Sequence, residues 1–145
     1  MNTFKTLLFK ITSGNQFILI IIIAFFYKTI QFILVQPQIV VDSNDYLVSA
    51  NYLFDFDNET IALRLPVYPL LIRILSLISP SLRLIIIIQL VLGIISVILL
   101  YLTVEQISGD KSAFICALLF LLSPTALYDS VIATESLAIF LNIAF

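Results

Sequence analysis

The sequence predicts an all-α fold, a polytopic bundle of membrane-spanning helices with amphipathic juxtamembrane helices in the first outer loop. Of its 145 residues, 61% are hydrophobic and 11% are charged, whereas soluble domains carry roughly 25% charged residues. Apolar runs long enough to cross a bilayer alternate with short polar segments, and five of the nine acidic residues lie between positions 42 and 59. We therefore expect an integral protein that crosses the plasma membrane several times.

Residue types that are missing from the sequence exclude several kinds of chemistry. The chain has no histidine and a single cysteine, Cys116. An intrachain disulfide, a cysteine metal cluster and activation of a nucleophile by histidine are therefore excluded. The seven Lys and Arg residues form no basic block, so nucleic acid is not an expected partner. Any catalysis must use carboxylates, hydroxyls, tyrosine, lysine or arginine.

The first predicted span covers residues 17–35. Its length in a helix is roughly 28 Å, which matches the hydrocarbon core of a bilayer. Lys5 and Lys10 precede it without an intervening acid, which places the N-terminus in the cytoplasm and residues 36–65 on the outer face. Lys28 lies inside this run. Its ammonium group either snorkels to the outer interface or pairs with an acid of another helix, and snorkelling is the simpler expectation.

The outer loop, residues 36–65, should contain a short surface helix from Ser43 to about Phe54. Asp42 or Ser43 can cap this helix, because either side chain offers an oxygen to a free backbone N–H group. Spacings of four, four and three residues would place a carboxylate, a phenol and two apolar side chains on one stripe: Asp42, Tyr46, Ala50 and Leu53. Such a helix lies along the membrane surface.

Two further segments follow the outer loop. Residues 66–79 combine an apolar run with two prolines and Arg73, which indicates a half-embedded or short spanning segment. Residues 84–104 form the clearest span in the sequence and should return to the cytoplasm.

The last two predicted spans are residues 112–127 and 131–145. Ser123 and Pro124 interrupt the first of these, so its helix should end at membrane depth with its open end facing protein or a water-filled cavity lined by residues 125–130. The second should start inward. Because the sequence stops at Phe145 inside an apolar run, we expect residues 1–145 to be the N-terminal portion of one transmembrane domain, inactive by itself.

Asp42 and Glu135 are the candidate functional residues that this topology brings to the outer side. A carboxylate inside an apolar helix is costly and often functional, which applies to Glu135. Two ordinary interpretations remain open: Asp42 is only a helix cap, and Glu135 only forms an ion pair with Lys28, Arg64 or Arg73.

Several short motifs, taken in order, resemble the N-terminal third of multi-spanning GT-C glycosyltransferases, and among them the protein-mannosyltransferase and aminoarabinose-transferase type (glycosyltransferase family 39). The motifs are Asp42-Ser43-x-x-Tyr46, then Arg64-x-Pro66-x-Tyr68-Pro69-Leu70, and finally Ser123-Pro124 with Tyr128 and Thr134-Glu135-Ser136-Leu137. The resemblance implies transfer of a sugar from a polyprenyl-phosphate carrier to a hydroxyl of a lipid, glycan or protein at the outer face.

The resemblance also assigns roles to individual residues. Asp42 matches the catalytic carboxylate of the first outer loop, and Glu135 matches an acidic residue beside the same site. The expected substrate contacts are Tyr46, Arg64, Tyr68 and Glu135. Asp42 would accept the proton of the acceptor hydroxyl, and Arg64 or Arg73 would stabilise the leaving phosphate. Many members carry two adjacent acids where this chain has Asp42 and Ser43.

Glu135 has two possible functions beside Asp42. Its charge could raise the pKa of Asp42 toward the range of a useful base. Alternatively, Asp42 and Glu135 could together hold a divalent metal, the one cofactor considered.

Two other functions fit the composition. A fragment of a membrane transporter would use Lys28, Arg73 and Glu135 as charges along a pathway. A non-catalytic helical membrane scaffold would leave the acidic loop merely solvated.

Overall fold

The computed structural model describes residues 15–52 and 66–144, and the regular elements within these ranges are all helices. The prediction of an all-α fold is therefore confirmed for the part of the chain that is described. The one departure from helix and loop is an isolated parallel bridge between Gln38 and Val131. The elements are α2 (Asn15–Leu34), α3 (Val41–Asn51), α5 (Val67–Ile78), α6 (Leu82–Ser108), α7 (Asp110–Leu121), the 3-10 helix η1 (Pro124–Ser130) and α8 (Glu135–Ala144).

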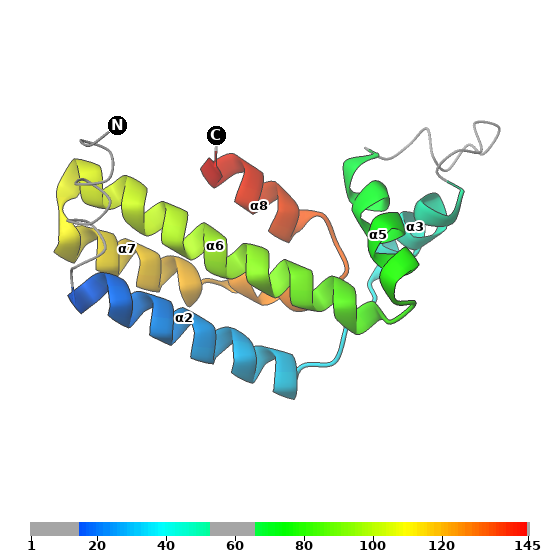
Figure 1. Cartoon of the computed structure of the whole chain (residues 1–145), viewed down its shortest axis with the longest axis horizontal. Coiled ribbons are helices and arrows are strands. Elements are labelled where there is room, and N and C mark those ends of the chain that lie inside the picture. Colours follow the sequence, from blue (N-terminus) through cyan, green and yellow to red (C-terminus); the bar gives the residue numbers. More distant parts are fainter. Residues whose placement is uncertain (1–14, 53–65, 145) are drawn as a thin grey trace.

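The longest helix, α6, is the axis about which the others are arranged (Figure 1). α2 and α7 pack along α6, and η1 continues the path of α7 toward the start of α6. α8 then turns back along α6, whereas α3 and α5 pack on each other beyond its N-terminus. We call this end of the molecule, formed by residues 36–52, 66–78 and 130–135, the α3 end.

Local sequence explains the boundaries of α6. The Ser81 side chain accepts a hydrogen bond from the Arg83 N–H at 3.3 Å and so caps the helix start. At the other end Gly109 adopts a φ of +80°, a left-handed conformation that other residues rarely reach. The chain can therefore reverse within one residue and begin α7 at Asp110.

The start of α3 differs from the sequence-based expectation. The helix begins at Val41, and Val40 is the residue that precedes it. Ser43 lies in the first turn, where its Oγ accepts the Val40 N–H at 3.0 Å and donates to the Ile132 carbonyl at 2.6 Å. Neither Asp42 nor Ser43 is therefore the N-cap residue, but the predicted capping of a free backbone N–H group by a side-chain oxygen is confirmed for Ser43.

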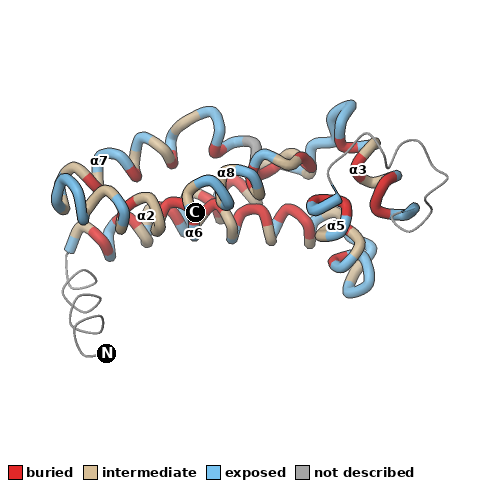
Figure 2. Tube along the Cα trace, turned by 90° about the horizontal axis from the view of Figure 1, so that it is seen from above, coloured by how far each residue is buried: buried red, intermediate tan, exposed pale blue. Residues whose placement is uncertain are grey.

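Two apolar clusters make up the core, one toward each end of α6. Near the α3 end the cluster comprises Tyr46, Ala50, Tyr68, Ile72, Leu75, Ile85, Ile86, Leu90 and Ile132. Toward the far end it comprises Phe17, Ile20, Ala24, Val97, Tyr101, Ala113, Ala117 and Leu121. Buried polar residues of several elements lie between them: Lys28, Gln31, Gln89, Ser96, Asp129 and Ser136. Figure 2 shows the buried face that runs along α6.

Two helices in the described ranges, α2 and α6, are long and apolar enough to cross a membrane. α5 and α8 are apolar but shorter. α7 ends at Leu121, so the sequence-based prediction that its helix stops before Ser123 and Pro124 is confirmed.

Candidate functional site

The α3 end is assembled by backbone pairing between segments that are far apart in the sequence. The Gln38 N–H donates to the Ser130 carbonyl at 2.9 Å, and the Ile132 N–H donates to the Gln38 carbonyl at 3.1 Å. The Ser43–Ile132 hydrogen bond adds a contact from α3 to the same segment. The loop after α2, the first turn of α3 and the segment that leads into α8 therefore form one unit.

Two tyrosines join α3 and α5 within this unit. The rings of Tyr46 and Tyr68 meet edge to face, with centroids 5.1 Å apart and an interplanar angle of 84°, a favourable geometry for aromatic pairs. The Tyr46 hydroxyl lies 3.4 Å from Thr134 Oγ1, directly before α8. Two of the predicted substrate-contacting residues are therefore neighbours, and one of them reaches the segment that carries Glu135.

Tyr68 is the most enclosed of the predicted site residues that the structure describes, with 1% of its surface exposed. Burial raises the pKa of its phenol well above the ordinary value, and the nearby charge of Glu135 and then Tyr46 raise it further. Its hydroxyl makes no hydrogen bond of full geometry with the described residues. A weaker interaction with the backbone of Ala133 lowers the pKa and so offsets part of the increase. The Tyr68 phenol is therefore held neutral, and its O–H donor is unsatisfied within the described residues.

A groove of about 150 Å³ lies beside this phenol, between α5 and α8. Its lining is apolar apart from the two hydroxyl-bearing side chains at one side: Val67, Tyr68, Thr134, Leu137, Ala138 and Leu141. Such a lining suits a hydrocarbon chain whose polar end meets Tyr68 and Thr134.

The remaining predicted site residues are placed as follows. Asp42 is exposed in the first turn of α3, and Glu135 is exposed as the first residue of α8. Both belong to elements of the α3 end, but neither carboxylate lines the groove between α5 and α8. Arg64 falls outside the described residues, and Arg73 is half-buried in α5.

No group of three or more potential metal ligands occurs within residues 15–52 and 66–144. Asp42 and Glu135 are two carboxylates, whereas Mg²⁺ and Ca²⁺ sites commonly recruit further oxygen ligands or water. The metal role of this pair stays a prediction.

The structure decides between the two interpretations of Lys28, because its ammonium group pairs with an acid of another helix, Asp129 of η1. Lys28 Nζ lies 2.7 Å from Asp129 Oδ2, and the side chains are only 2% and 5% exposed. The expectation that Lys28 snorkels to the interface was therefore wrong, and so was its suggested pairing with Glu135. Asp129 is the only charged residue between Lys111 and Glu135, which is the signal that could have identified it.

Comparisons with known proteins give no relative for this chain: no protein-family model, curated protein or solved structure matches it. The chemistry of the α3 end is therefore argued from its residues.

Proposed function

We propose that the protein is a membrane glycosyltransferase that moves a sugar from a polyprenyl-phosphate carrier to an acceptor hydroxyl at the outer face of the plasma membrane. The observation that carries the proposal is the meeting of three elements at the α3 end. The Tyr46 hydroxyl reaches Thr134, and the Tyr46 ring packs on Tyr68. The element that carries Asp42 therefore adjoins the start of α8, which carries Glu135.

The membrane part of the proposal uses the lengths of α2 and α6. Both helices have the length and composition of spans. α7 with η1 runs alongside α6 in the opposite direction (Figure 1). With the N-terminus in the cytoplasm, α2 leads outward and α6 returns, so the α3 end lies at the outer surface.

The residues of this end suit the reaction. The hydrocarbon chain of the donor would occupy the groove between α5 and α8, where Tyr68 and Thr134 offer hydroxyl groups to its polar end. The acceptor oxygen attacks the anomeric carbon and gives its proton to the Asp42 carboxylate, while the bond from that carbon to the phosphate oxygen breaks. The polyprenyl phosphate leaves with the electron pair, and Arg64 or Arg73 would stabilise its charge.

Glu135 has two roles compatible with its position. Its charge near Tyr68 favours the protonated phenol, which keeps that group a hydrogen-bond donor. If the enzyme uses a divalent metal, Asp42 and Glu135 would hold it, and the metal would supply charge stabilisation for the phosphate.

Exchange of Asp42 for asparagine tests the proposal in membranes that contain the full-length protein. Asp42→Asn should lower sugar transfer from a polyprenyl-phosphate donor by about 100-fold or more, because positioned general bases contribute roughly 10²–10⁴-fold. Asp45→Asn makes the same change one turn later on α3 and should retain transfer. Equal amounts of both variants in the membrane would exclude an insertion defect, and a parental rate for Asp42→Asn would remove this residue from the mechanism.

The transporter interpretation has one observation in its favour, the buried Lys28–Asp129 pair beside a broken helix. Lys28 is, however, fully occupied by protein acceptors, which suits a structural ion pair better than a transport pathway.

A further inference from the structure

Two polar side chains of α2 donate hydrogen bonds to backbone carbonyl groups of η1. Lys28 Nζ donates to the Ala126 carbonyl at 2.7 Å. Gln31, one turn further along α2, donates through Nε2 to the Leu127 carbonyl at 3.2 Å and to that of Ala126 at 3.4 Å. Lys28 and Gln31 therefore tie η1 to α2.

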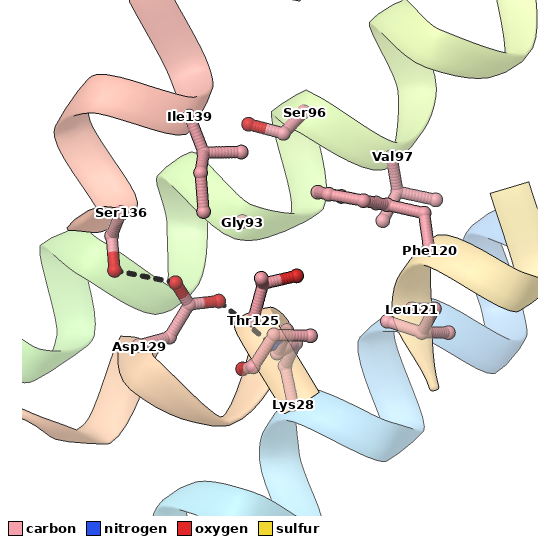
Figure 3. A pocket seen from close by; sticks show the side chains of 11 residues that line it. Lys28, Gly93, Ser96, Val97, Phe120, Leu121, Thr125, Asp129, Ser136 and Ile139 are labelled. Carbon is pink, nitrogen blue, oxygen red and sulfur yellow. Dashed lines mark hydrogen bonds and ion pairs between the residues drawn. The ribbon is translucent and has the colours of Figure 1, made fainter. Parts of the chain in front are cut away.

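The same lysine then fixes Asp129. Lys28 Nζ reaches Asp129 Oδ2 at 2.7 Å and Gln31 Oε1 at 3.1 Å, in addition to Ala126. An ammonium group has three N–H donors, so each donor has an acceptor. The second carboxylate oxygen, Asp129 Oδ1, accepts the Ser136 hydroxyl at 2.5 Å. A continuous chain of polar contacts thus runs from α2 to the first turn of α8 (Figure 3).

α6 leaves just enough room for this pair. A Cβ atom added at Gly93 would collide with Asp129 Oδ2 and would lie 3.1 Å from Asp129 Cγ and 3.3 Å from Lys28 Cε. The adjoining cavity is only about 10 Å³ and is lined by Ser96, Thr125 and Asp129 among others, so it could accommodate about one water molecule. The carboxylate therefore has little space to turn away.

We infer that Lys28 and Asp129 are positioning residues, which hold the segment 130–135 against the rest of the α3 end and so set the place of Glu135 at the start of α8. The inference rests on the proposed function for its purpose, but the geometry it describes can be measured without an enzyme assay. Asp129 accepts the hydroxyl of Ser136, the neighbour of Glu135. Gln89 of α6 donates to the carbonyls of Val131 and Ala133 at 2.9 and 3.1 Å. Loss of the ion pair should therefore loosen this segment before it disrupts the helices.

Cysteine labelling of the full-length protein in detergent micelles tests the inference. With Cys116 replaced by serine, Ala133→Cys reports on the segment and Ala117→Cys on the core of the bundle, since these positions are 5% and 0% exposed. Gly93→Ala and the double replacement Lys28→Met with Asp129→Leu each remove the pair. The double replacement avoids an unpaired buried charge, which often preserves stability. Ser96→Ala, on the same helix, is the matched control, because its hydroxyl bonds only to Leu92 of its own helix at 2.9 Å.

We expect maleimide labelling at position 133 to become about tenfold faster or more in both pair-removing proteins, while labelling at position 117 and in the Ser96→Ala control stays at the parental rate. Sugar transfer should fall in the same two proteins, measured without the reporter cysteines. Unchanged labelling at position 133 in both would overturn the inference, and so would equal acceleration at positions 133 and 117, which marks general loosening. If labelling changes as expected but the parent transfers no sugar, the proposed function fails and the structural role of the pair stands.

Discussion

Tyr68 is the residue whose chemistry depends most on its surroundings. Its ring is buried under α3 by the contact with Tyr46, and its hydroxyl lacks a hydrogen-bond partner within the described residues. An unsatisfied buried donor costs roughly 1–3 kcal/mol. A polar group of a bound substrate would satisfy this donor, so the cost would favour substrate binding at Tyr68.

A spectroscopic titration checks this environment directly. Because burial and the Glu135 charge raise the pKa of Tyr68, its phenol should stay protonated while ordinary phenols ionise near pH ~10. Folded parent and Tyr68→Phe proteins should therefore show the same phenolate absorbance up to about pH 11. In denaturant the parent should show one additional phenolate. A difference of one phenolate between the folded proteins near pH ~10 would contradict the burial of Tyr68.

Sequence reasoning identified individual residues unevenly. Glu135 and Tyr68 were named, and the structure brings their elements together. Snorkelling was the wrong choice for Lys28, because the position of a lysine within an apolar run does not show which acid it pairs with. That acid, Asp129, lies 101 positions later. Such a pair depends on the path of α7 and η1 past α2, which no local pattern specifies.

At the scale of elements, helices set by composition were predictable and those set by contacts were not. The apolar runs of α2 and α6 and the break before Ser123 follow from residue types and prolines. The start of α3 at Val41 does not, because valine is a poor cap and the first turn is held through Ser43 and Ile132. The segment between η1 and α8 likewise depends on donors from elsewhere, since Gln89 of α6 donates to the carbonyls of Val131 and Ala133.

Gln89 is the α6 side chain that supplies donors to this segment. Its Nε2 donates to the carbonyls of Val131 and Ala133, and the residue is 1% exposed. Gln89→Leu keeps the approximate size and removes both donors, so it should lower the free energy of unfolding by about 1–3 kcal/mol. Unfolding in mixed micelles measures this loss. Gln106→Leu is the matched control, since Gln106 is exposed on the same helix. Equal stability of the two variants would mean that Gln89 does not hold the segment.

At the scale of the whole molecule, the proposal requires the α3 end and the turn between α6 and α7 to lie on opposite sides of the membrane. α6 has 27 residues, about 40 Å at the helical rise, which exceeds the hydrocarbon core of about 30 Å. α2 has 20 residues, which is about 30 Å. Both helices therefore have the length to separate the two ends completely.

Labelling of single cysteines in intact cells tests whether the α3 end and the turn between α6 and α7 lie on opposite sides of the membrane. With Cys116 replaced by serine, cysteines at Val41 and Glu135 report on the α3 end, and one at Ser108 reports on the turn before α7; all three positions are exposed. A membrane-impermeant maleimide should label the first two without permeabilisation and the third only after it, because Lys5 and Lys10 retain the N-terminus in the cytoplasm. If position 135 were protected while position 41 is labelled, Asp42 and Glu135 could not share a site, and the glycosyltransferase proposal would lose its geometric basis. Labelling of all three from outside would show instead that α6 does not cross the membrane.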